Sequence, residues 1–341
     1  MITSSPPICT ICIANYNGES LLVECIDSIL NQQCEFEFEI IVHDDASTDK
    51  SLELLHNKYP QVRTIESKEN VGFCISNNRM VSQASGEFIL LLNNDATLMP
   101  DALTTFYKHA SSQPISGILT LPQYDWETGH LVDRGCLLDL FYNPVPNLDP
   151  GRTSVAMVIG ACLWIPKKLW IELGGFPVWF ESIAEDMQIC CHARLAGFPV
   201  EVTQKSGYRH QQGNSFGGNR ITDGRLKTTY RRRRLSERNK TFVMSVCTPF
   251  PVLWLLLPLH ILTLTLEGLL LALFKRDRRL FVDIYANAIY SVIHKRQRIS
   301  EERLLVQISR VTPTKIYLSS FTLFPHKLRM LIRYGIPRLT C

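Results

Sequence analysis

The stretch Gly86-Glu87-Phe88-Ile89-Leu90-Leu91-Leu92-Asn93-Asn94-Asp95 decides how this chain folds. Its middle, Phe88 to Leu92, is wholly apolar, which is typical of a strand buried on both faces of a parallel sheet. The run ends abruptly at two amides and one carboxylate. Ligands of open α/β sheets bind beyond the carboxyl ends of the strands, so Asp95 is a candidate for holding a metal or a polar ligand. The alternative is that Asn94 and Asp95 only form a turn before a helix near Pro100.

Strands and helices are predicted to alternate along the first two hundred residues. Apolar runs predict strands at 8–14, 38–42, 62–66, 88–92, 115–121 and 158–165. Helical spacing predicts helices at about 20–30, 48–59, 73–84, 100–112, 166–174 and 185–196. Ser20 is the expected N-cap of the first helix, and Ser47 or Thr48 that of the second. Such alternation predicts right-handed crossovers and a mainly parallel, Rossmann-like α/β sheet.

Three of these strands end in polar turns, which the fold would bring to the same edge. The turns are Asn15-Tyr16-Asn17, Asp44-Asp45 and Asn93-Asn94-Asp95. One polar turn is routine, whereas three on one edge predict a site. No Gly-x-Gly-x-x-Gly follows the first strand and no Gly-x-x-x-x-Gly-Lys-Ser/Thr occurs, which argues against a dehydrogenase and a P-loop nucleotidase. The long aromatic segment 123–150 is expected to bind an acceptor at the same edge.

The composition limits the number of domains and indicates the cellular compartment of the protein. The 341 residues, 45% of them hydrophobic, suffice for one large or two modest domains. Eleven scattered cysteines without zinc spacing predict a reducing cytosol, and the N-terminus predicts no signal peptide. Net charge is +4, but from Lys275 onwards fourteen Lys and Arg face four acids. This asymmetry predicts a basic C-terminal part that faces a membrane or a polyanion.

The C-terminal third contains an apolar stretch at about 242–274. Its inner run, 252–274, has 23 residues, fifteen of them Leu, Ile, Val or Phe, which is long enough to cross a bilayer. Basic residues flank both ends, so we expect a re-entrant or in-plane anchor rather than a single crossing; an ordinary buried helix is the alternative. The run Arg231–Arg234 is expected at anionic lipid headgroups rather than on nucleic acid. We divide the chain into a domain at 1–220 and a basic, apolar helical region at 221–341.

The motifs, in this order, resemble family-2 glycosyltransferases, and most of all their bacterial rhamnosyltransferase-like branch. The resemblance covers about 8–215. It rests on eight motifs: Asn15-Tyr16-Asn17, Asp44-Asp45-Ala46-Ser47-Thr48-Asp49, Asn70-Val71-Gly72-Phe73, Asn93-Asn94-Asp95, Gly160-Ala161-Cys162-Leu163, Gly174-Gly175-Phe176, Glu185-Asp186 and His210.

The resemblance implies a GT-A fold and an inverting transfer of a sugar, with rhamnose a candidate, from a dTDP- or UDP-sugar to a glycan or lipid-linked acceptor. It also implies that this sugar transfer belongs to cell-surface polysaccharide synthesis and takes place at the cytoplasmic face of the cell membrane. It implies that Asp186 is the general base, beside Glu185, and that Asp95 and His210 hold Mg²⁺ or Mn²⁺ on the donor diphosphate. The implied nucleotide-sugar pocket is larger and comprises Asn15, Tyr16, Asn17, Asp44, Asp45, Gly72, Asn78, Asn93 and Asn94, with Arg79 as a further candidate.

Two departures from the family pattern keep alternatives open. The metal motif is Asn93-Asn94-Asp95, with one carboxylate where many relatives have two, and Gln188 stands where this branch often has an acid. These departures would suit a catalytically weak or inactive, membrane-anchored assembly protein. The presence of Asp95 and Asp186 favours the enzyme. A nucleotidyltransferase would need a Gly-rich, Arg-containing loop after the first strand, which is absent.

Overall fold

The computed structural model describes residues 6–211, 220–222 and 225–340. They divide into two compact units that interleave along the sequence. Unit 1 contains Met1–Cys136, Pro146–Ser182 and Phe198–Gln212, and unit 2 contains Leu137–Val145, Ile183–Gly197 and Gly213–Cys341. The division differs from one cut after residue 220, because the segment 183–197 packs with C-terminal residues. That residues 1–220 act as the catalytic domain stays a prediction.

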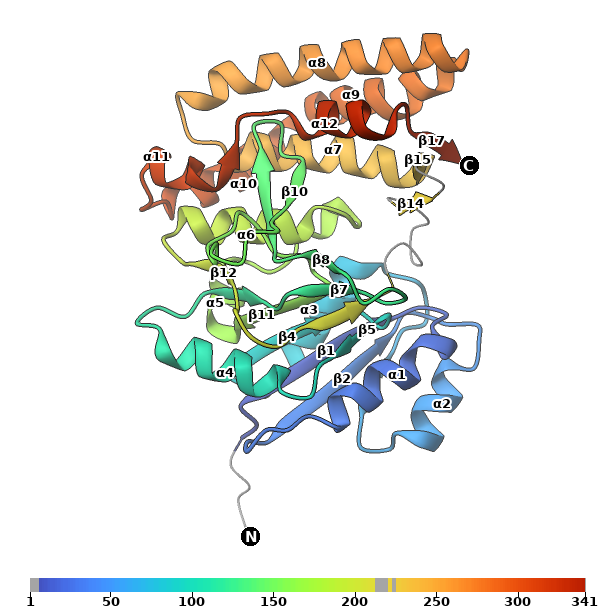
Figure 1. Cartoon of the computed structure of the whole chain (residues 1–341), viewed down its shortest axis with the longest axis vertical. Coiled ribbons are helices and arrows are strands. Elements are labelled where there is room, and N and C mark those ends of the chain that lie inside the picture. Colours follow the sequence, from blue (N-terminus) through green and yellow to red (C-terminus); the bar gives the residue numbers. More distant parts are fainter. Residues whose placement is uncertain (1–5, 212–219, 223–224, 341) are drawn as a thin grey trace. The chain divides into compact units, whose positions relative to one another are not determined.

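A seven-stranded sheet forms the centre of unit 1, in the order β12-β6-β11-β4-β1-β2-β3 (Figure 1). Its strands are β1 (Cys9–Asn15), β2 (Phe38–Asp44), β3 (Arg63–Glu66), β4 (Phe88–Leu92), β6 (Ile118–Thr120), β11 (Cys162–Pro166) and β12 (Val200–Val202). Strands β4, β1, β2 and β3 run parallel, as predicted. Strand β11 is antiparallel to both β4 and β6, so the sheet is mixed.

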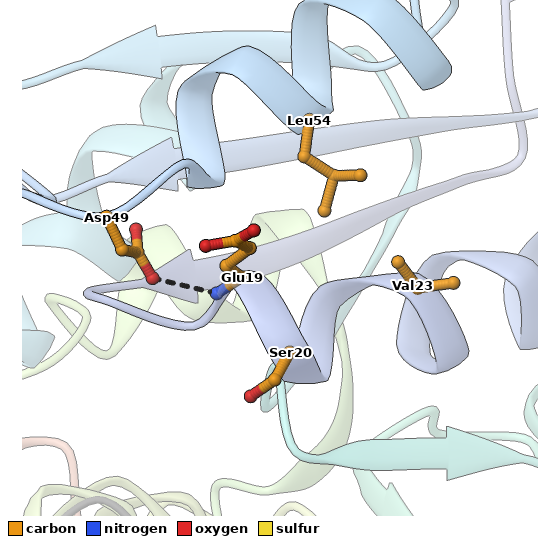
Figure 2. A pocket seen from close by; sticks show the side chains of 5 residues that line it. All are labelled: Glu19, Ser20, Val23, Asp49 and Leu54. Carbon is orange, nitrogen blue, oxygen red and sulfur yellow. Dashed lines mark hydrogen bonds between the residues drawn. The ribbon is translucent and has the colours of Figure 1, made fainter.

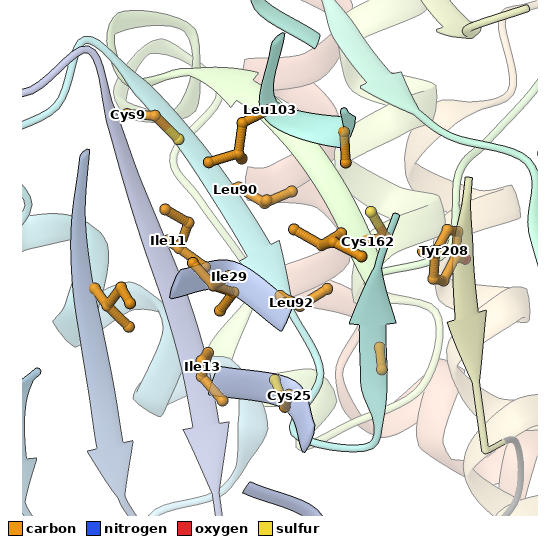
Figure 3. Close-up of a cluster of buried hydrophobic side chains, with 14 of the residues drawn as sticks. Cys9, Ile11, Ile13, Cys25, Ile29, Leu90, Leu92, Leu103, Cys162 and Tyr208 are labelled. Carbon is orange, nitrogen blue, oxygen red and sulfur yellow. The ribbon is translucent and has the colours of Figure 1, made fainter. Parts of the chain in front are cut away.

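Helices cover both faces of this sheet. They are α1 (Glu19–Leu30), α2 (Ser51–Lys58), α3 (Phe73–Gln83), α4 (Ala102–Ser112) and α5 (Lys167–Glu172), followed by the short 3₁₀ helix η1 (Val178–Phe180). Alternate strand residues such as Ile11 and Leu90 share one core cluster with Ile29 of α1 and Leu103 of α4 (Figure 3). All five residues of β4 are buried, which confirms that the opening apolar run is a doubly covered strand.

Two predicted helix starts are wrong by a few residues. Gly18, not Ser20, is the N-cap of α1, and α2 begins only at Ser51. The Asp49 carboxylate accepts hydrogen bonds from the backbone N–H and the Oγ–H of Ser51 at 3.0 and 2.6 Å. Asp49 thus binds the first turn of α2, the role predicted for Ser47 or Thr48. Ser47 and Thr48 do not cap α2 because both bind Asn17 of the preceding turn, through Ser47 Oγ at 2.9 Å and the Thr48 N–H at 2.7 Å.

The segment expected to be an irregular loop contains short strands. These are β7 (Gln123–Asp125), β8 (Leu131–Asp133), β9 (Cys136–Asp139) and β10 (Pro144–Pro146). In unit 1, β7 and β8 join β5 (Ala96–Leu98) and β13 (Tyr208–His210) in a sheet ordered β5-β13-β7-β8. The pairing of β13 with β5 places His210 opposite Ala96, so the chain just after Asp95 lies beside His210.

Unit 2 is mainly helical. Its helices are α6 (Glu185–Leu195), α7 (Tyr230–Cys247), α8 (Val252–Lys275), the π-helix η2 (Leu280–Ala286), α9 (Asn287–His294), α10 (Arg296–Ile308), α11 (Thr314–Tyr317), the 3₁₀ helix η3 (Leu318–Ser320) and α12 (His326–Tyr334). Short strands complete it: β16 (Phe321–Thr322) pairs with β9, and β15 (Arg225–Thr229) lies between β14 (Arg220–Thr222) and β17 (Arg338–Thr340). The two long helices α7 and α8 are consecutive in the chain.

Charged residues of α7 are buried in an ion-pair network. Glu237 Oε1 lies 2.9 Å from Arg233 Nε and 2.7 Å from Lys327 Nζ of α12, and its other oxygen contacts Lys240 Nζ. Lys327 Nζ also lies 2.6 Å from Glu267 Oε2 of α8. Paired in this way, the charges can be buried without the penalty of isolated ions.

Two predictions about the C-terminal region need correction. Residues Phe242–Cys247, expected to begin the apolar anchor, are buried inside unit 2. Arg233, expected at lipid headgroups, is held in ion pairs, whereas Arg231 and Arg234 are exposed. What remains as a membrane candidate is α8, which is long and apolar enough to cross a bilayer by length and composition alone.

Candidate active site

Side chains from three strand ends meet at the carboxyl edge of the main sheet. Asn15 and Asp44 stand opposite each other where β1 and β2 end. The Asn15 Nδ2 donates to Asp44 Oδ2 at 3.0 Å, and the Asn94 Nδ2 donates to Asn15 Oδ1 at 2.8 Å. All three residues are buried. The structure therefore brings these three predicted residues together, with Asn15 as the bridge.

The turn after β1 packs against the turn after β2. Asn17 donates its backbone N–H to Ser47 Oγ at 2.9 Å, and its Oδ1 accepts from the Thr48 N–H at 2.7 Å. Ser47 in turn donates its N–H to Asp44 Oδ1 at 2.9 Å. Tyr16 lies at the tip of this turn with 52% of its surface exposed. An exposed ring on a rigid turn can stack on a planar ligand.

Gly18, which directly follows the turn Asn15-Tyr16-Asn17, is a site residue that the sequence analysis did not single out. A Cβ at this position would lie 2.3 Å from Asn15 Oδ1 and 2.3 Å from Asn94 Nδ2. No side chain fits at that distance, so glycine is required for the Asn15–Asn94 hydrogen bond to form. The signal was present as the glycine of the Asn-Tyr-Asn-Gly turn, but the clashing partner is 76 residues away in the sequence.

Two predicted ligand-binding residues form hydrogen bonds with the backbone of the protein. Asp45 accepts the backbone N–H groups of Val71 and Gly72, both at 2.8 Å. The Asn78 amide donates to Phe176 O at 2.9 Å and accepts from the Phe176 N–H at 3.0 Å. Both side chains thereby fix loops of unit 1. Gly72, at φ 87°, adopts a conformation that favours glycine in the loop that Asp45 holds.

Asp95 and His210 are brought together as a pair. His210 Nε2 lies 3.1 Å from Asp95 Oδ1, and both side chains are almost fully covered. The Gln211 N–H donates to Asp95 O at 2.9 Å, which continues the pairing of β13 with β5. Apart from that 3.1 Å ion-pair contact, Asp95 Oδ1 and His210 Nδ1 have no hydrogen-bond partner within the described part of the chain. Asn93, two residues before Asp95, is half-buried.

A divalent cation fits the donor atoms of this pair. A buried carboxylate oxygen that lacks a hydrogen bond, next to an imidazole nitrogen, offers two ligands of types that Mn²⁺ accepts. Among residues 6–211, 220–222 and 225–340 there is no group of three His, Cys, Asp or Glu that could hold a metal ion. Mg²⁺ and Mn²⁺ sites of this kind are completed by substrate phosphates and water. The pair suits a cation that arrives with a phosphorylated ligand.

Glu185 and Asp186 begin α6 in unit 2, as predicted, and follow an unusual backbone. Glu181, Ile183 and Ala184 all have positive φ, at 67°, 72° and 71°. Such conformations are costly for residues other than glycine and cluster at functional sites. The Asp186 Oδ1 accepts from the Met187 N–H at 2.7 Å. The backbone strain therefore lies immediately before the acidic pair.

The two carboxyl groups of this pair differ in environment. Burial and the neighbouring Asp186 carboxylate raise the pKa of Glu185 to about 8, so Glu185 carries a proton at neutral pH. Arg232 of α7 interacts electrostatically with both acids, and burial lowers the pKa of its guanidinium. The sequence analysis placed Arg232 in a lipid-facing run. Its place beside the acids depends on how α7 packs on α6, which no local pattern reports.

The hollow in Figure 2 is separate from these groups. It has a volume of about 500 Å³ and is lined by Glu19, Ser20, Val23, Asp49 and Leu54 of α1, α2 and the turn before α2. The Glu19 N–H donates to Asp49 Oδ2 at 3.0 Å across it. None of its lining residues is a predicted ligand-binding residue. The segment 212–215, predicted to be a polar loop after His210, lies outside the described residues.

Known proteins resemble this chain in sequence. It is 32% identical to the poly(ribitol-phosphate) beta-glucosyltransferase of Bacillus spizizenii over 205 residues, or 58% of this chain and 31% of the relative. It is 39% identical to the chondroitin synthase of Pasteurella multocida over 174 residues, or 50% of this chain and 17% of the relative. The chain thus spans less than a third of the length of these curated relatives. Neither relative tests the rhamnosyltransferase-like assignment, which stays a prediction.

A solved structure and a family model complete the comparison. The crystal structure of GalNAc-T7 with UDP, GalNAc and Mn²⁺ superposes with a TM-score of 0.62 at 13% identity, covering 98% of this chain and 59% of the other. This likeness confirms the GT-A fold with its mixed α/β sheet. The family model of Glycosyl transferase family 2 matches residues 10–172. Residues 10–172 are therefore similar to glycosyl transferase family 2.

Proposed function

We propose that this chain is an inverting glycosyltransferase that moves a sugar from a dTDP- or UDP-linked donor to a hydroxyl of a glycan or lipid-linked acceptor. Rhamnose is one candidate sugar, and cell-surface polysaccharide synthesis is the proposed setting. The observation that carries the proposal is the convergence of Asn15, Asp44 and Asn94 at one sheet edge, followed directly by the Asp95–His210 pair. The family 2 match over residues 10–172 supports the same activity.

In this proposal, the nucleotide part of the donor binds along the turns after β1 and β2. Tyr16, Asn17 and Asn93 offer groups that are exposed or half-buried. Asn15, Asp44 and Asn94 shape the floor beneath them by their mutual hydrogen bonds. Asp45 and Gly72, in two loops, and Asn78, on α3, would support the pocket from behind, because their contacts are with the backbone of unit 1.

Asp95 and His210 would hold Mg²⁺ or Mn²⁺. When bound, the cation would neutralise charge that builds up on the leaving diphosphate. Asp95 contributes a buried carboxylate oxygen without a hydrogen-bond donor among the described residues. His210 contributes a ring nitrogen on a strand whose position is fixed by pairing on both sides. GalNAc-T7, named as crystallised with UDP and Mn²⁺, supports this choice of ion.

Asp186 would be the general base that takes the proton of the acceptor hydroxyl. A base must be ionised before the reaction, and the pKa of about 8 for Glu185, raised by burial and by Asp186, leaves Glu185 protonated at neutral pH. A protonated carboxyl cannot accept that proton, which favours Asp186 over its neighbour. Arg232 would then position the pair and offset its charge.

We also propose that the enzyme works at the cytoplasmic face of the cell membrane, on an anionic surface. The support is the apolar helix α8 together with the exposed cations Lys275, Arg276, Arg278 and Arg279 at its end. A nucleic-acid partner is not proposed, because Arg233 is held in ion pairs with Glu237 and Glu267.

A donor screen tests the activity. The full chain is heated with each dTDP- and UDP-sugar in turn, with and without Mn²⁺, and a donor that binds the folded state raises the melting temperature. Turnover is then measured with the donors that shift it. A donor that binds tightly but is never transferred or hydrolysed would instead favour the inactive assembly protein. If no dTDP- or UDP-sugar shifts the melting temperature, with or without Mn²⁺, the proposed function is rejected.

A further inference from the structure

Helix α8 has two faces of different character. One stripe along the helix is buried: Leu253, Leu256, His260, Leu264 and Gly268. The other side is exposed and apolar, with exposed fractions between 49% and 75% for Trp254, Leu255, Leu262, Leu266, Leu269, Leu270, Leu273 and Phe274. At about 1.5 Å per residue, this exposed face runs for roughly 30 Å along unit 2. An exposed apolar surface of this length marks an interaction site.

The buried stripe is fastened to unit 2 along most of its length. His260 Nε2 lies 2.8 Å from Thr241 Oγ1 of α7. Gly268 abuts Tyr285 of η2 so closely that a Cβ would lie 2.6 Å from its ring. Glu267 pairs with Arg233 of α7 and with Lys327 of α12. A helix that crossed a bilayer would have to leave these partners and carry Glu267 into hydrocarbon, where a charge is costly.

Positive charge gathers at the C-terminal end of the exposed face. Lys275, Arg276, Arg278 and Arg279 are all exposed and directly follow Leu273 and Phe274. The acid among them, Asp277, accepts a hydrogen bond from Tyr230 Oη at 2.7 Å, so its charge is turned toward the protein. Exposed apolar side chains next to exposed cations are the composition of helices that lie in the headgroup region of anionic membranes.

We propose that α8 lies flat in the interfacial layer of an anionic bilayer, with its exposed face toward the acyl chains and Lys275–Arg279 at lipid phosphates. The proposal rests on the membrane location above and supplies the face and the orientation. A protein partner would be the other occupant of such a face. The exposed face is rich in leucine, which is under-represented among the residues that dominate protein–protein binding, so lipid is favoured.

Vesicle flotation of the full chain tests the contact. The test variant replaces Leu255, Leu262 and Leu273 by Gln, and the matched control replaces Leu304, Leu305 and Ile308 of α10, which are 61%, 64% and 74% exposed, also by Gln. With vesicles of phosphatidylcholine and phosphatidylglycerol, we expect the test variant to lose roughly 100-fold in partitioning and the control less than about threefold. Unchanged melting temperatures would show that both variants fold.

The outcomes separate location from orientation. If the wild-type chain does not float with vesicles of any composition, the proposed membrane location is wrong. If it also forms oligomers that the test variant does not form, a second copy of the chain covers α8. Equal flotation of test and control variants overturns the assignment of the face. Depth is read as the nitroxide-lipid quenching that Leu266→Trp adds to that of the wild type, which already carries Trp254 on this helix: added quenching that is stronger near the headgroups supports a flat helix, and added quenching that is strongest at the bilayer centre overturns it. None of these readouts depends on transferase activity.

Discussion

The strand-end network of unit 1 and the start of α6 in unit 2 satisfy their polar groups in opposite ways. Asp44 and Asp45 receive hydrogen bonds on both carboxylate oxygens from side chains and backbone. Glu185 is equally buried, yet its Oε2 has no hydrogen-bond donor within the described residues. Groups that the protein satisfies hold its shape, whereas a buried acid left unsatisfied costs stability and marks its surroundings, here the Glu185–Asp186 pair, as a place kept for chemistry. The comparison predicts where substitutions harm activity and where they harm folding.

The largest effect is expected at Asp186. Asp186→Asn keeps the shape and removes the basic lone pair, so turnover should fall by roughly 10²–10⁴-fold, the scale of a positioned base. Donor Kd should stay nearly constant, because the base acts on the acceptor. Glu185→Gln is the matched control and should lower turnover by a smaller factor. Measurements of kcat and donor Kd for both variants show which acid is the base. If Glu185→Gln has no turnover while Asp186→Asn turns over normally, Glu185 is the base.

Asp95→Asn is expected to abolish the effect of Mn²⁺ on donor binding. Apart from the 3.1 Å contact with His210 Nε2, this carboxylate oxygen has no hydrogen-bond partner in the part of the chain that the structure describes, so Asp95→Asn should change the melting temperature of the ligand-free protein little. The Mn²⁺-dependent shift in melting temperature with a UDP-sugar should disappear. The same shift in the variant and the wild type would exclude Asp95 as a metal ligand.

Glu185 should make stability depend on pH. Burial and Asp186 raise its pKa from 4.5 to about 8 on folding, so between these values the folded state binds more protons than the unfolded state. The free energy of unfolding should therefore fall by up to about 1.4 kcal/mol per pH unit as pH rises through this window. Glu185→Gln should remove this dependence. Urea unfolding at pH 5, 6.5 and 8 measures it, and parallel curves for the two proteins would contradict the assignment.

Asp45→Ala should harm folding more than chemistry. It leaves the N–H groups of Val71 and Gly72 without their acceptor, at a cost of about 1–3 kcal/mol in the free energy of unfolding. Turnover at saturating donor should change little at a temperature where the variant is folded. A variant of wild-type stability that no longer binds a donor would mean that Asp45 is a ligand-binding residue.

The sequence predicted what local patterns encode. The apolar run of β4 and its polar end were located to the residue, because doubly buried strands are continuous in sequence. The clamp of Asp45 on Gly72 and the closeness of Gly18 to Asn94 were missed, because each joins residues brought together only by strand register. The burial of α7 was missed for a related reason: its run Arg231–Arg234 was placed at lipid headgroups, and the buried ion pair of Glu237 involves Lys327, 90 residues further on.

The neighbours of α6 set a limit on how this protein can be shortened. His192 contacts Ser309 Oγ at 2.9 Å, the Arg194 guanidinium donates to Tyr317 O, and the Arg194 carbonyl accepts from Thr312 Oγ1 at 2.7 Å. These partners come from residues more than a hundred positions downstream. A fragment that ends near residue 220 would expose the back of the helix that carries Asp186. Such a fragment would keep Asp186 but lose the residues that support the helix on which Asp186 lies.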